Sequence, residues 1–478
     1  MSESYAALHT DFYQITMAAV YHRRGMNGQA TFSLFPHDLP AQRGYILAAG
    51  LADALKYLSE FRFTPEEVDY LGSLNRFEQS FLDMLAGLRF SGEVWALPEG
   101  TVCFAGEPLL EVTAPLIEAQ LVETRLIQLI NLHSTLASKA ARCVQAADGR
   151  TCVDFSLRRT QGREAGWAAA RSSAIAGFTG TSNVEASQAL GTIPVGTMAH
   201  AFVEAFGDEL ASFRAFAETF PEGTVLLVDT YDSVEGLHQA VQIAGELREK
   251  GKRLVGVRLD SGDLVGMSRQ ARQMLDAAGL EETRVVVSGS LDEFRMAELV
   301  SQGAMVDVFG VGTKMGSSAD APYLDLAYKL VTYDGRPTLK LSTGKETWAC
   351  PKQLWRTLDQ DGRIAGDVLG LRGEQFDGEP LLKQVMTDGR PTDPAPDWRE
   401  AQQRFSEQKA TLPEVCLRLL DPRPLGITPS EELRKVQQQA RQRRPQQERE
   451  LPRGLDQRVG PHQTLGPDQR RDDRVARG

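Results

Sequence analysis

The sequence has little that would place it in a membrane or in a nucleic-acid complex. No apolar stretch in its 478 residues approaches the length of a membrane-spanning helix, and the start MSESYAALHTD has no basic segment followed by an apolar core. The formal net charge of -11 argues against a general nucleic-acid binder. We therefore expect a soluble, cytoplasmic protein with no membrane and no nucleic-acid partner, in which a local basic pocket can still bind an anionic substrate.

Paired cysteines and a nucleotide-binding P-loop are also missing. The chain has 5 cysteines, an odd number, scattered and without a CxxC motif. This pattern favours reduced thiols in the cytosol over a disulfide framework or a zinc site. No GxxxxGK[ST] segment occurs, so an ordinary nucleotide P-loop is not indicated.

The sequence does contain a repeated pattern, a short apolar run that ends at small, acidic or hydroxyl residues. The four runs are VLLVD (225–229), LVGVRLD (254–260), RVVVSGS (284–290) and VDVFGVGT (306–313). Runs rich in Val and Leu without polar alternation predict strands buried on both faces, and the segments between them have room for one helix each. The alternation predicts parallel βα units in an open sheet or a closed barrel. Active sites of parallel barrels lie at the carboxyl ends of the strands, which here carry DTYD, DSGD, SGS and GVGT.

The length and the 42% apolar content predict two domains and a tail. We expect an N-terminal α/β domain over 1–147, with a short β-rich segment and a linking helix. A (β/α) barrel with the active site should follow over 148–338. Its six strands are expected near Cys152, Val195, Leu226, Val255, Val286 and Val308, so a closed barrel would need irregular or missing members. Residues 339–429 should pack back on the N-terminal domain, and the Gln- and Arg-rich segment 430–478 should be a disordered polar tail.

The richest cluster of polar residues is GTMAHAFVEAF (196–206). Thr197 is a candidate helix cap, and His200 falls in the first helical turn, where free N–H groups and the helix dipole favour an anion. A histidine there can hold or covalently accept a phosphoryl group. The alternative is a histidine that only caps or packs locally.

Arginines and carboxylates follow two other strands. Arg158 and Arg159 lie just past a strand end in DFSLRRTQG, where a guanidinium can grip a diphosphate; a structural ion pair is the alternative. Arg258 and Asp260 are two residues apart, so they share a face at a pocket rim, unless they form only an internal salt bridge. Asp229 ends the preceding strand in the same way.

The remaining candidates are helix caps and small-residue loops. Asp232 and Asp263 are expected to cap the helices that follow them. Gly289, Gly312 and the Thr313 hydroxyl lie in two consecutive loops where backbone amides can approach a sugar phosphate.

In this order and spacing, TDFYQITM, DFSLRRTQG, GFTGTSNV, GTMAHAFV, LVDTYD, GVRLDSGDL and FGVGTKM resemble the nicotinate phosphoribosyltransferase family. The resemblance covers roughly residues 8–331 and, more loosely, the segment to about 420. It implies an irregular (β/α) barrel of the type II phosphoribosyltransferase kind, packed on a second, smaller α/β domain. It also implies a homodimer with the site near the interface. The implied reaction joins nicotinate to phosphoribosyl pyrophosphate, giving nicotinate mononucleotide and pyrophosphate in NAD biosynthesis, coupled to ATP hydrolysis through a phosphohistidine.

The resemblance also implies roles for individual residues. His200 would be the phosphorylated histidine; Tyr13, Thr197 and Arg258 would surround nicotinate. Gly312 and Thr313 would bind the phosphoribosyl phosphate, and Asp260 would lie near the ribose or Mg²⁺. Family members often have Glu where this chain has Asp154, a change that bears on barrel packing.

The implied chemistry fits these residue types. Displacement of pyrophosphate builds positive charge on the ribose and negative charge on the leaving group. Asp229 and Asp260 can face the sugar, while Arg158 and Mg²⁺ face the diphosphate. Arg258 would meet the nicotinate carboxylate, and Tyr13 can stack on the ring.

Other functions remain open at this point. A nicotinamide phosphoribosyltransferase shares the fold and differs in whether the pocket neutralises a carboxylate. A phosphosugar lyase on a (β/α) barrel needs a strand-borne lysine for a Schiff base, for which Lys314 and Lys329 are the candidates. A barrel that only binds nucleotides is expected to lose His200 or the DSGD charges, which this chain keeps.

Overall fold

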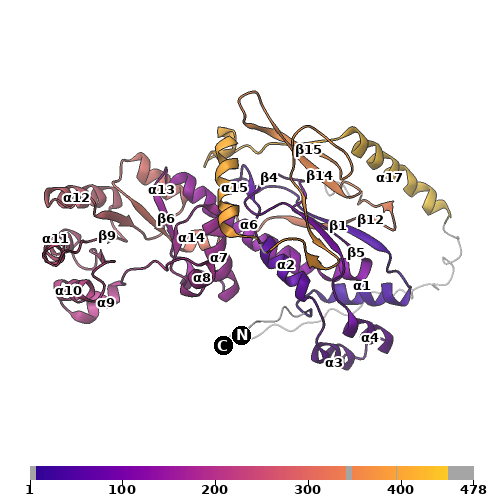
Figure 1. Ribbon diagram of the computed structural model, residues 1–478, viewed down its shortest axis with the longest axis horizontal. Coiled ribbons are helices and arrows are strands. Elements are labelled where there is room, and N and C mark those ends of the chain that lie inside the picture. Colours follow the sequence, from indigo (N-terminus) through magenta and orange to yellow (C-terminus); the bar gives the residue numbers. More distant parts are fainter. Residues whose placement is uncertain (1–6, 341–346, 395, 451–478) are drawn as a thin grey trace, which may run out of the picture.

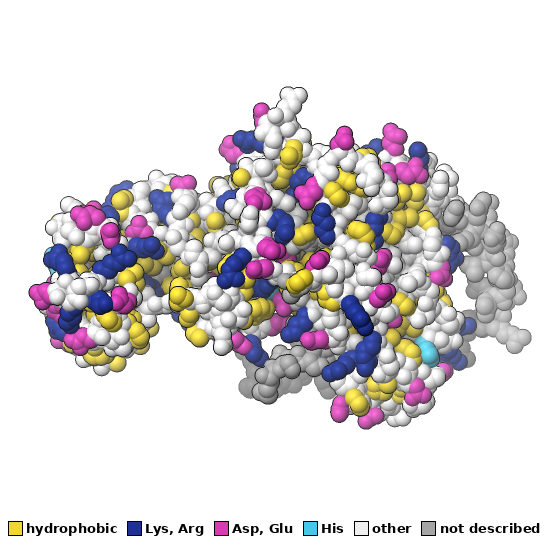
Figure 2. Space-filling view, viewed as in Figure 1, with side chains coloured by type: hydrophobic (Ala, Val, Ile, Leu, Met, Phe, Trp, Pro, Cys, Tyr) yellow, Lys and Arg dark blue, Asp and Glu magenta, His cyan; other side chains and the backbone are white. Residues whose placement is uncertain are grey.

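The computed structural model describes residues 7–340, 347–394 and 396–450, with residues 443–450 as backbone only. Two lobes of unequal size lie side by side along the longest axis of the molecule (Figure 1). Acidic and basic side chains are mixed over the visible face of both lobes (Figure 2). No helix in the described part of the chain is long and apolar enough to cross a bilayer.

The larger lobe is built on a sheet of seven strands whose pairs are antiparallel. In their order across the sheet, the strands are β13 (Arg336–Pro337), β12 (Leu326–Tyr333), β1 (Gln29–Pro36), β5 (Leu110–Pro115), β3 (Glu93–Ala96), β17 (Lys383–Thr387) and β18 (Arg390–Pro391). Its helices are α1 (Phe12–Arg23), α2 (Leu51–Glu60), α3 (Pro65–Ser73) and α4 (Gln79–Gly87). One large apolar cluster joins this sheet to these helices.

A smaller sheet in the same lobe comes from the C-terminal part of the chain. Its strands are β16 (Glu379–Pro380), β14 (Lys352–Leu358), β15 (Ile364–Leu371) and β19 (Ile427–Pro429), and a separate pair joins β2 (Ile46–Leu47) to β4 (Val102–Cys103). Because β17 pairs with β3 of the seven-stranded sheet, the segment after 339 returns to the N-terminal domain.

The smaller lobe contains the parallel sheet that the apolar runs predict. Its order is β7 (Gly180–Thr181), β6 (Thr151–Asp154), β11 (Val308–Val311), β10 (Arg284–Val287), β9 (Gly256–Leu259) and β8 (Val225–Leu227). The elements around it are the 3-10 helix η1 (Leu157–Arg159), α8 (Val184–Leu190), α9 (His200–Phe206), α10 (Glu209–Thr219), α11 (Ser233–Glu249), α12 (Leu264–Ala277), α13 (Glu293–Ser301) and α14 (Thr313–Gly316). Strands β7 and β8 are edges, so the expected barrel is a curled half-barrel, and the α/β class is confirmed.

One expected strand of this sheet is wrong. The sequence predicts a strand near Val195, whereas the sixth strand is the two-residue β7. Val195 only donates its N–H to the carbonyl of Thr181, at 2.9 Å. Pro194 and Gly196 flank Val195, and they oppose the continuation of a regular strand there.

Helices between the lobes connect them tightly. They are α6 (Glu123–Ala146), α7 (Arg163–Ala176), α15 (Trp398–Thr411) and α16 (Glu414–Leu417), whereas α5 (Leu116–Leu121), just before α6, packs on α1, β1 and β5 of the larger lobe. Lys139 of α6 is buried and forms ion pairs with Glu293 of α13 and, at 2.6 Å, with Asp320. Phe405 of α15 belongs to the same apolar cluster as Phe309 of the half-barrel. The half-barrel is therefore packed on the larger lobe through a continuous core.

The strand pairing corrects the expected end of the barrel domain at 338. Strand β12 pairs with β1 over its whole length, so residues 326–333 belong to the N-terminal sheet. The half-barrel ends after α14.

The expected disordered tail is also wrong in its first part. Residues Glu431–Glu450 form helix α17, which packs on β15. Leu433 is fully buried, and Gln437 accepts a hydrogen bond from the Ala349 N–H at 3.0 Å and donates one to the Thr347 carbonyl at 2.8 Å. One fully buried leucine and one bonded amide hold a helix whose composition is otherwise mostly polar. Residues 451–478, the rest of the expected tail, lie outside the described residues.

We expect Leu433→Ala to lower the free energy of unfolding by about 2 to 5 kcal/mol, because it leaves a cavity where a fully buried side chain stood. Gln438→Ala, an exposed position of the same helix, is the matched control and should change stability by less than about 0.5 kcal/mol. Urea unfolding of both variants measures the difference. Equal stabilities would show that α17 contributes no core.

Candidate functional site

The site is centred on Arg258, which lies on β9, next to the edge strand β8 of the half-barrel. Its side chain is 13% exposed, and its Nη2 lies 2.6 Å from Asp260 Oδ1, so the two residues share a face as their spacing predicts. Nε donates to Ser288 Oγ at 2.8 Å, and Nη1 donates to Thr197 Oγ1 at 3.3 Å. The guanidinium also lies over the Phe155 ring, 5.4 Å from its centre. Nη1 also donates to the Met198 carbonyl at 3.4 Å, so these contacts fix a largely buried cation and leave one of its five N–H groups unassigned.

Asp260 lies at the carboxyl end of β9 and is kept ionised. Burial acts to raise the pKa of its carboxyl, but hydrogen bonds from Ser288 and Arg258 and the charges of Arg258 and His200 outweigh burial, so this pKa lies below its usual value. The Ser288 hydroxyl therefore bridges the carboxylate and the arginine. The arrangement places a carboxylate next to a guanidinium at the rim.

The Asp229 side chain bonds the backbone of the neighbouring DSGD loop. Its Oδ2 accepts the N–H groups of Asp260 and Ser261 at 2.8 and 2.9 Å, which fixes the DSGD turn. Its Oδ1 is buried and has no hydrogen-bond partner in the described protein. The next two acidic residues are helix caps as predicted, because Asp232 accepts from two N–H groups of α11 and Asp263 accepts from one of α12.

His200 is the first residue of α9, so its predicted place in a first helical turn is confirmed. Its Nδ1 lies 3.1 Å from Thr230 Oγ1, and no bond to Nε2 is found among the described residues. The N-cap of α9 is Ala199, so the expected cap at Thr197 is wrong. The chain is extended through Ala199, and the Thr197 hydroxyl instead accepts from Arg258.

The small-residue loops surround the same edge. Gly289 has φ +87°, and a Cβ on it would lie 1.9 Å from the carbonyl oxygen of Asp260. Only glycine therefore allows the SGS loop to approach the DSGD turn this closely. Gly312 is the N-cap of α14 and Thr313 is its first, exposed residue, at the carboxyl end of β11.

Arg158 and Arg159 lie in η1, which packs against α14, so they are near Thr313. Both are exposed, and neither makes an ion pair with another described residue. The structural ion pair considered from the sequence is therefore absent from the described part of the chain. These cations are free to meet an anion.

Tyr13 is not brought to the other candidates. It lies on α1, and α1 and β9 are at opposite ends of the molecule (Figure 1). The side chain is 50% exposed. Burial against the helix, followed by the charges of Glu123 and Asp11, raises the pKa of its hydroxyl. Within one chain, Tyr13 cannot contact a ligand held by Arg258.

The lysines needed by a Schiff-base lyase are also misplaced. Lys314 lies in α14, and its amine is engaged in an ion pair with Asp292 at 2.6 Å. Lys329 is on β12, in the other lobe. Neither lysine projects from a strand of the half-barrel.

Asp154 ties two strands of the half-barrel together. Its two oxygens accept the Ser156 N–H at 2.8 Å and the Thr181 hydroxyl at 2.7 Å. The carboxyl is buried, and burial raises its pKa. These contacts stabilise the adjoining ends of β6 and β7, which is a packing role.

Glu209 contributes a buried carboxyl near Asp229 that the sequence did not predict. Glu209, the first residue of α10, is 7% exposed, and its Oε1 has no hydrogen-bond partner in the described protein. Burial and then the charges of Glu235, Asp229 and Asp232 raise the pKa of Glu209 to about 7. This part of the half-barrel therefore concentrates negative charge.

We expect Glu209→Gln to stabilise the protein at pH 8 and to have little effect at pH 5. The pKa of Glu209 is about 7 in the folded protein and about 4.5 in the unfolded chain. Ionised Glu209 therefore lowers the stability of the fold: this loss is absent below about pH 4.5 and complete above about pH 7. After allowance for solvent screening, the gain at pH 8 should be about 1 to 2 kcal/mol. Chemical unfolding of wild type and variant at both pH values measures it. An equal difference at the two pH values would contradict the assignment.

Sequence reasoning missed three residues that complete the site: Ser288, Thr230 and Phe155. Ser288 belongs to the SGS segment and Thr230 to the DTYD segment. Their positions at strand ends could have identified both as candidate site residues. Phe155 carries no such signal, because a phenylalanine after a strand is usually core.

The fold and site define a class of protein. A parallel half-barrel whose strand ends present a desolvated arginine, paired carboxylates, glycine loops and a histidine at a helix start belongs with enzymes that bind phosphorylated substrates on (β/α) barrels.

Comparison with known proteins narrows this class to one family. Three family models match: the nicotinate phosphoribosyltransferase N-terminal domain over 8–131, the nicotinate phosphoribosyltransferase family over 150–346 and its C-terminal domain over 374–437. The chain belongs to the nicotinate phosphoribosyltransferase family.

Individual relatives cover most of the chain. Nicotinate phosphoribosyltransferase pncB2 of Mycobacterium tuberculosis is 48% identical over 403 residues, which are 83% of this chain and 86% of the relative. The Homo sapiens nicotinate phosphoribosyltransferase is 32% identical over 508 aligned positions, which cover 89% of this chain and 94% of the relative. The crystal structure of the human enzyme superposes with a TM-score of 0.81 at 31% identity, covering 90% of this chain and 99% of that one. The crystal structure of a nicotinate-nucleotide pyrophosphorylase from Pyrococcus furiosus superposes with a TM-score of 0.70 at 25% identity, covering 86% of this chain and 96% of that chain.

Proposed function

We propose that this chain is a nicotinate phosphoribosyltransferase of NAD biosynthesis, which forms nicotinate mononucleotide and pyrophosphate from nicotinate and phosphoribosyl pyrophosphate. Family membership supports this, and one observation carries it: Arg258 is a nearly buried cation fixed at the carboxyl edge of the half-barrel, with an N–H group left for a substrate carboxylate. A neutral pyridine amide would gain much less from such a cation.

The roles of the other residues follow from their positions. Asp260, ionised at the rim, would stabilise positive charge on the ribose in the transition state. The glycine loop at Gly289, with Gly312 and Thr313, would bind the phosphoribosyl phosphate, and Arg158 would meet the diphosphate. The pyridine nitrogen has a free lone pair at neutral pH, so no general base is required.

Mg²⁺ fits the donors at this edge. Asp260 is a partly exposed, ionised carboxylate, and the unpartnered Asp229 Oδ1 lies on the neighbouring loop. Asp260 would hold the ion. When bound, Mg²⁺ would supply charge neutralisation to the leaving diphosphate.

We assign the ATP-coupled step to His200. Thr230 engages Nδ1, which leaves Nε2 as the nitrogen able to accept a phosphoryl group from ATP. In that step a new N–P bond forms as the bond from the γ-phosphoryl group to ADP breaks. His200 is the first residue of α9, whose first-turn N–H groups would favour the resulting negative charge.

A homodimer would bring Tyr13 to the site. Tyr13, Met17 and Val20 lie at i, i+4 and i+7 on α1 and are 50%, 36% and 57% exposed, which forms an apolar stripe available to a second copy. Since α1 and β9 are at opposite ends of one chain, the partner subunit would supply the tyrosine that stacks on nicotinate.

This arrangement predicts recovery of activity in mixed chains. Tyr13→Ala and Arg258→Ala should each be strongly impaired alone. If the two side chains come from different subunits, a mixture refolded together should regain about a quarter of wild-type activity, because half of the dimers contain one intact site of two. No recovery would place both side chains in one chain or exclude Tyr13 from the site.

The direct test of the function is product identification. Purified protein is incubated with phosphoribosyl pyrophosphate and, separately, nicotinate, nicotinamide or quinolinate, with and without Mg-ATP. The proposal predicts a mononucleotide from nicotinate, formed more efficiently with Mg-ATP. A product from nicotinamide alone or quinolinate alone would refute it.

A further inference from the structure

A second cluster of ligating side chains lies in the larger lobe, away from the proposed active site. Strands β1 and β12 run antiparallel, and their pairing ends at Pro36 and Leu326. One step further, the His37 N–H donates to the Asp325 carbonyl at 2.7 Å. Residues directly opposite each other on antiparallel strands project to the same side, so His37 and Asp325 face a common space.

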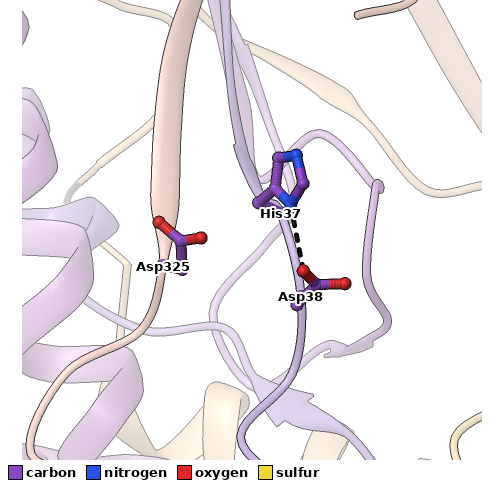
Figure 3. Close-up of side chains that lie close together, drawn as sticks. All are labelled: His37, Asp38 and Asp325. Atoms are coloured by element: carbon purple, nitrogen blue, oxygen red, sulfur yellow. Dashed lines mark hydrogen bonds and ion pairs between the residues drawn. The ribbon is translucent and has the colours of Figure 1, made fainter. Parts of the chain in front are cut away.

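Asp38 completes the cluster. Its Oδ2 lies 3.1 Å from His37 Nδ1, and the potential ligand atoms of His37, Asp38 and Asp325 all lie within 4.8 Å of one another. Figure 3 shows the imidazole and the Asp38 carboxylate side by side, with the Asp325 carboxylate on the neighbouring segment. In the part of the chain that the structure describes, no other group of three His, Cys, Asp or Glu side chains meets this criterion.

The two carboxylates lack a compensating cation. Neither Asp38 nor Asp325 forms an ion pair with a described lysine or arginine. Asp320, five residues before Asp325, differs in this respect because Arg43 and Lys139 both pair with it. The fold thus neutralises one aspartate of this region and holds two others close together with only a histidine beside them.

The segments that carry the cluster are held in place. Arg43 follows His37 in the chain and bonds Asp320 at 2.7 Å and the Ser318 hydroxyl at 3.3 Å. These bonds join the loop after β1 to the loop before β12, while the strand pairing fixes their other ends. A ligand set on two anchored segments requires little ordering when an ion binds.

We propose that His37, Asp38 and Asp325 form a binding site for a first-row divalent metal ion of the zinc class. One imidazole nitrogen and two carboxylate oxygens suit such an ion better than Mg²⁺ or Ca²⁺, which prefer all-oxygen sets. Three protein ligands with water in the remaining position match an open zinc site. The ion would take the place of the hydrogen bond between His37 and Asp38, and it would join the end of β1 to the start of β12. This proposal is independent of the transferase reaction.

Cobalt(II) is the probe, because its visible absorption reports the ligands directly. Full-length protein free of metal is titrated with Co²⁺ and then with Zn²⁺ as competitor. We expect one equivalent to bind with visible bands of nitrogen and oxygen ligation, and Zn²⁺ to displace it. Asp325→Asn and His37→Gln should each weaken binding about tenfold or more.

The matched control is Asp334→Asn, which removes the same charge just beyond the opposite end of β12 and should leave Co²⁺ binding unchanged. Asparagine tolerates the φ of +48° at that position. Three results would each overturn the proposal: no binding at millimolar Co²⁺, equal affinity in wild type and both site variants, or a strong near-ultraviolet thiolate band that places the ion on a cysteine.

Discussion

Arg258→Ala should raise the Michaelis constant for nicotinate far more than that for phosphoribosyl pyrophosphate. Arg258 is 13% exposed and bonds Asp260, Ser288 and Thr197, so its charge is poorly screened by water. Loss of the charge partner of a desolvated carboxylate costs about 2 to 5 kcal/mol. This corresponds to roughly a 30-fold to 4000-fold loss in kcat/KM for nicotinate.

Two further variants separate recognition from packing. Ser288→Ala breaks the bridge between Arg258 and Asp260 but keeps the cation, and it should retain selectivity for nicotinate. Arg258→Lys keeps the charge without the fork of N–H donors and should recover only part of the loss. Steady-state kinetics with each substrate varied in turn give the comparison. Equal increases for both substrates in Arg258→Ala would mean that the arginine grips phosphates or is purely structural.

His200→Ala should abolish nicotinate-stimulated ATP hydrolysis while some ATP-independent transfer survives. The reason is that in the proposed mechanism the imidazole accepts the phosphoryl group, whereas Arg258, Asp260 and the glycine loops would still bind the transferase substrates. Incubation with ATP labelled in the γ-phosphate should give an acid-labile, base-stable phosphate on wild type and none on the variant. Normal labelling of His200→Ala would remove the histidine from this role.

His238→Ala is a suitable control, because this histidine lies on α11 outside the described contacts of the site. It should label like wild type. Thr230→Val keeps His200 but removes the hydroxyl at its Nδ1, so it should slow labelling without preventing it. Together the three variants distinguish the acceptor from the group that orients it.

Much of the half-barrel edge could be predicted from the sequence, because strand ends impose simple geometry. A spacing of two residues on a strand placed Arg258 and Asp260 on one face, which the structure confirms; the two side chains also form the salt bridge that the sequence left open as an alternative. Acidic residues before helical runs predicted the caps at Asp232 and Asp263, which are also confirmed. These predictions use only local periodicity and the parallel direction of neighbouring strands.

The errors arise where structure depends on distant contacts. Strand β7 has only two residues and so leaves no apolar run to detect. Helix α17 depends on one buried leucine and one amide bonded to the segment at 347–349, which composition alone hides. The separation of Tyr13 from Arg258 follows from how two lobes pack, and no pattern within α1 reports it. In the sequence, Glu209 looks like an ordinary acidic residue in the first turn of a helix, and nothing there indicates that its carboxyl is buried.

We propose that this site transfers phosphoribosyl to nicotinate because Arg258 neutralises the carboxylate. One competition measures this directly: equal concentrations of nicotinate and nicotinamide are offered with phosphoribosyl pyrophosphate and Mg-ATP, and the two mononucleotides are quantified for wild type and Arg258→Ala. We expect the wild type to form overwhelmingly nicotinate mononucleotide. In the variant the preference for nicotinate should fall by about two orders of magnitude, within the range expected for a lost carboxylate partner. A wild type that makes chiefly nicotinamide mononucleotide, or a variant that keeps the full preference for nicotinate, would contradict it.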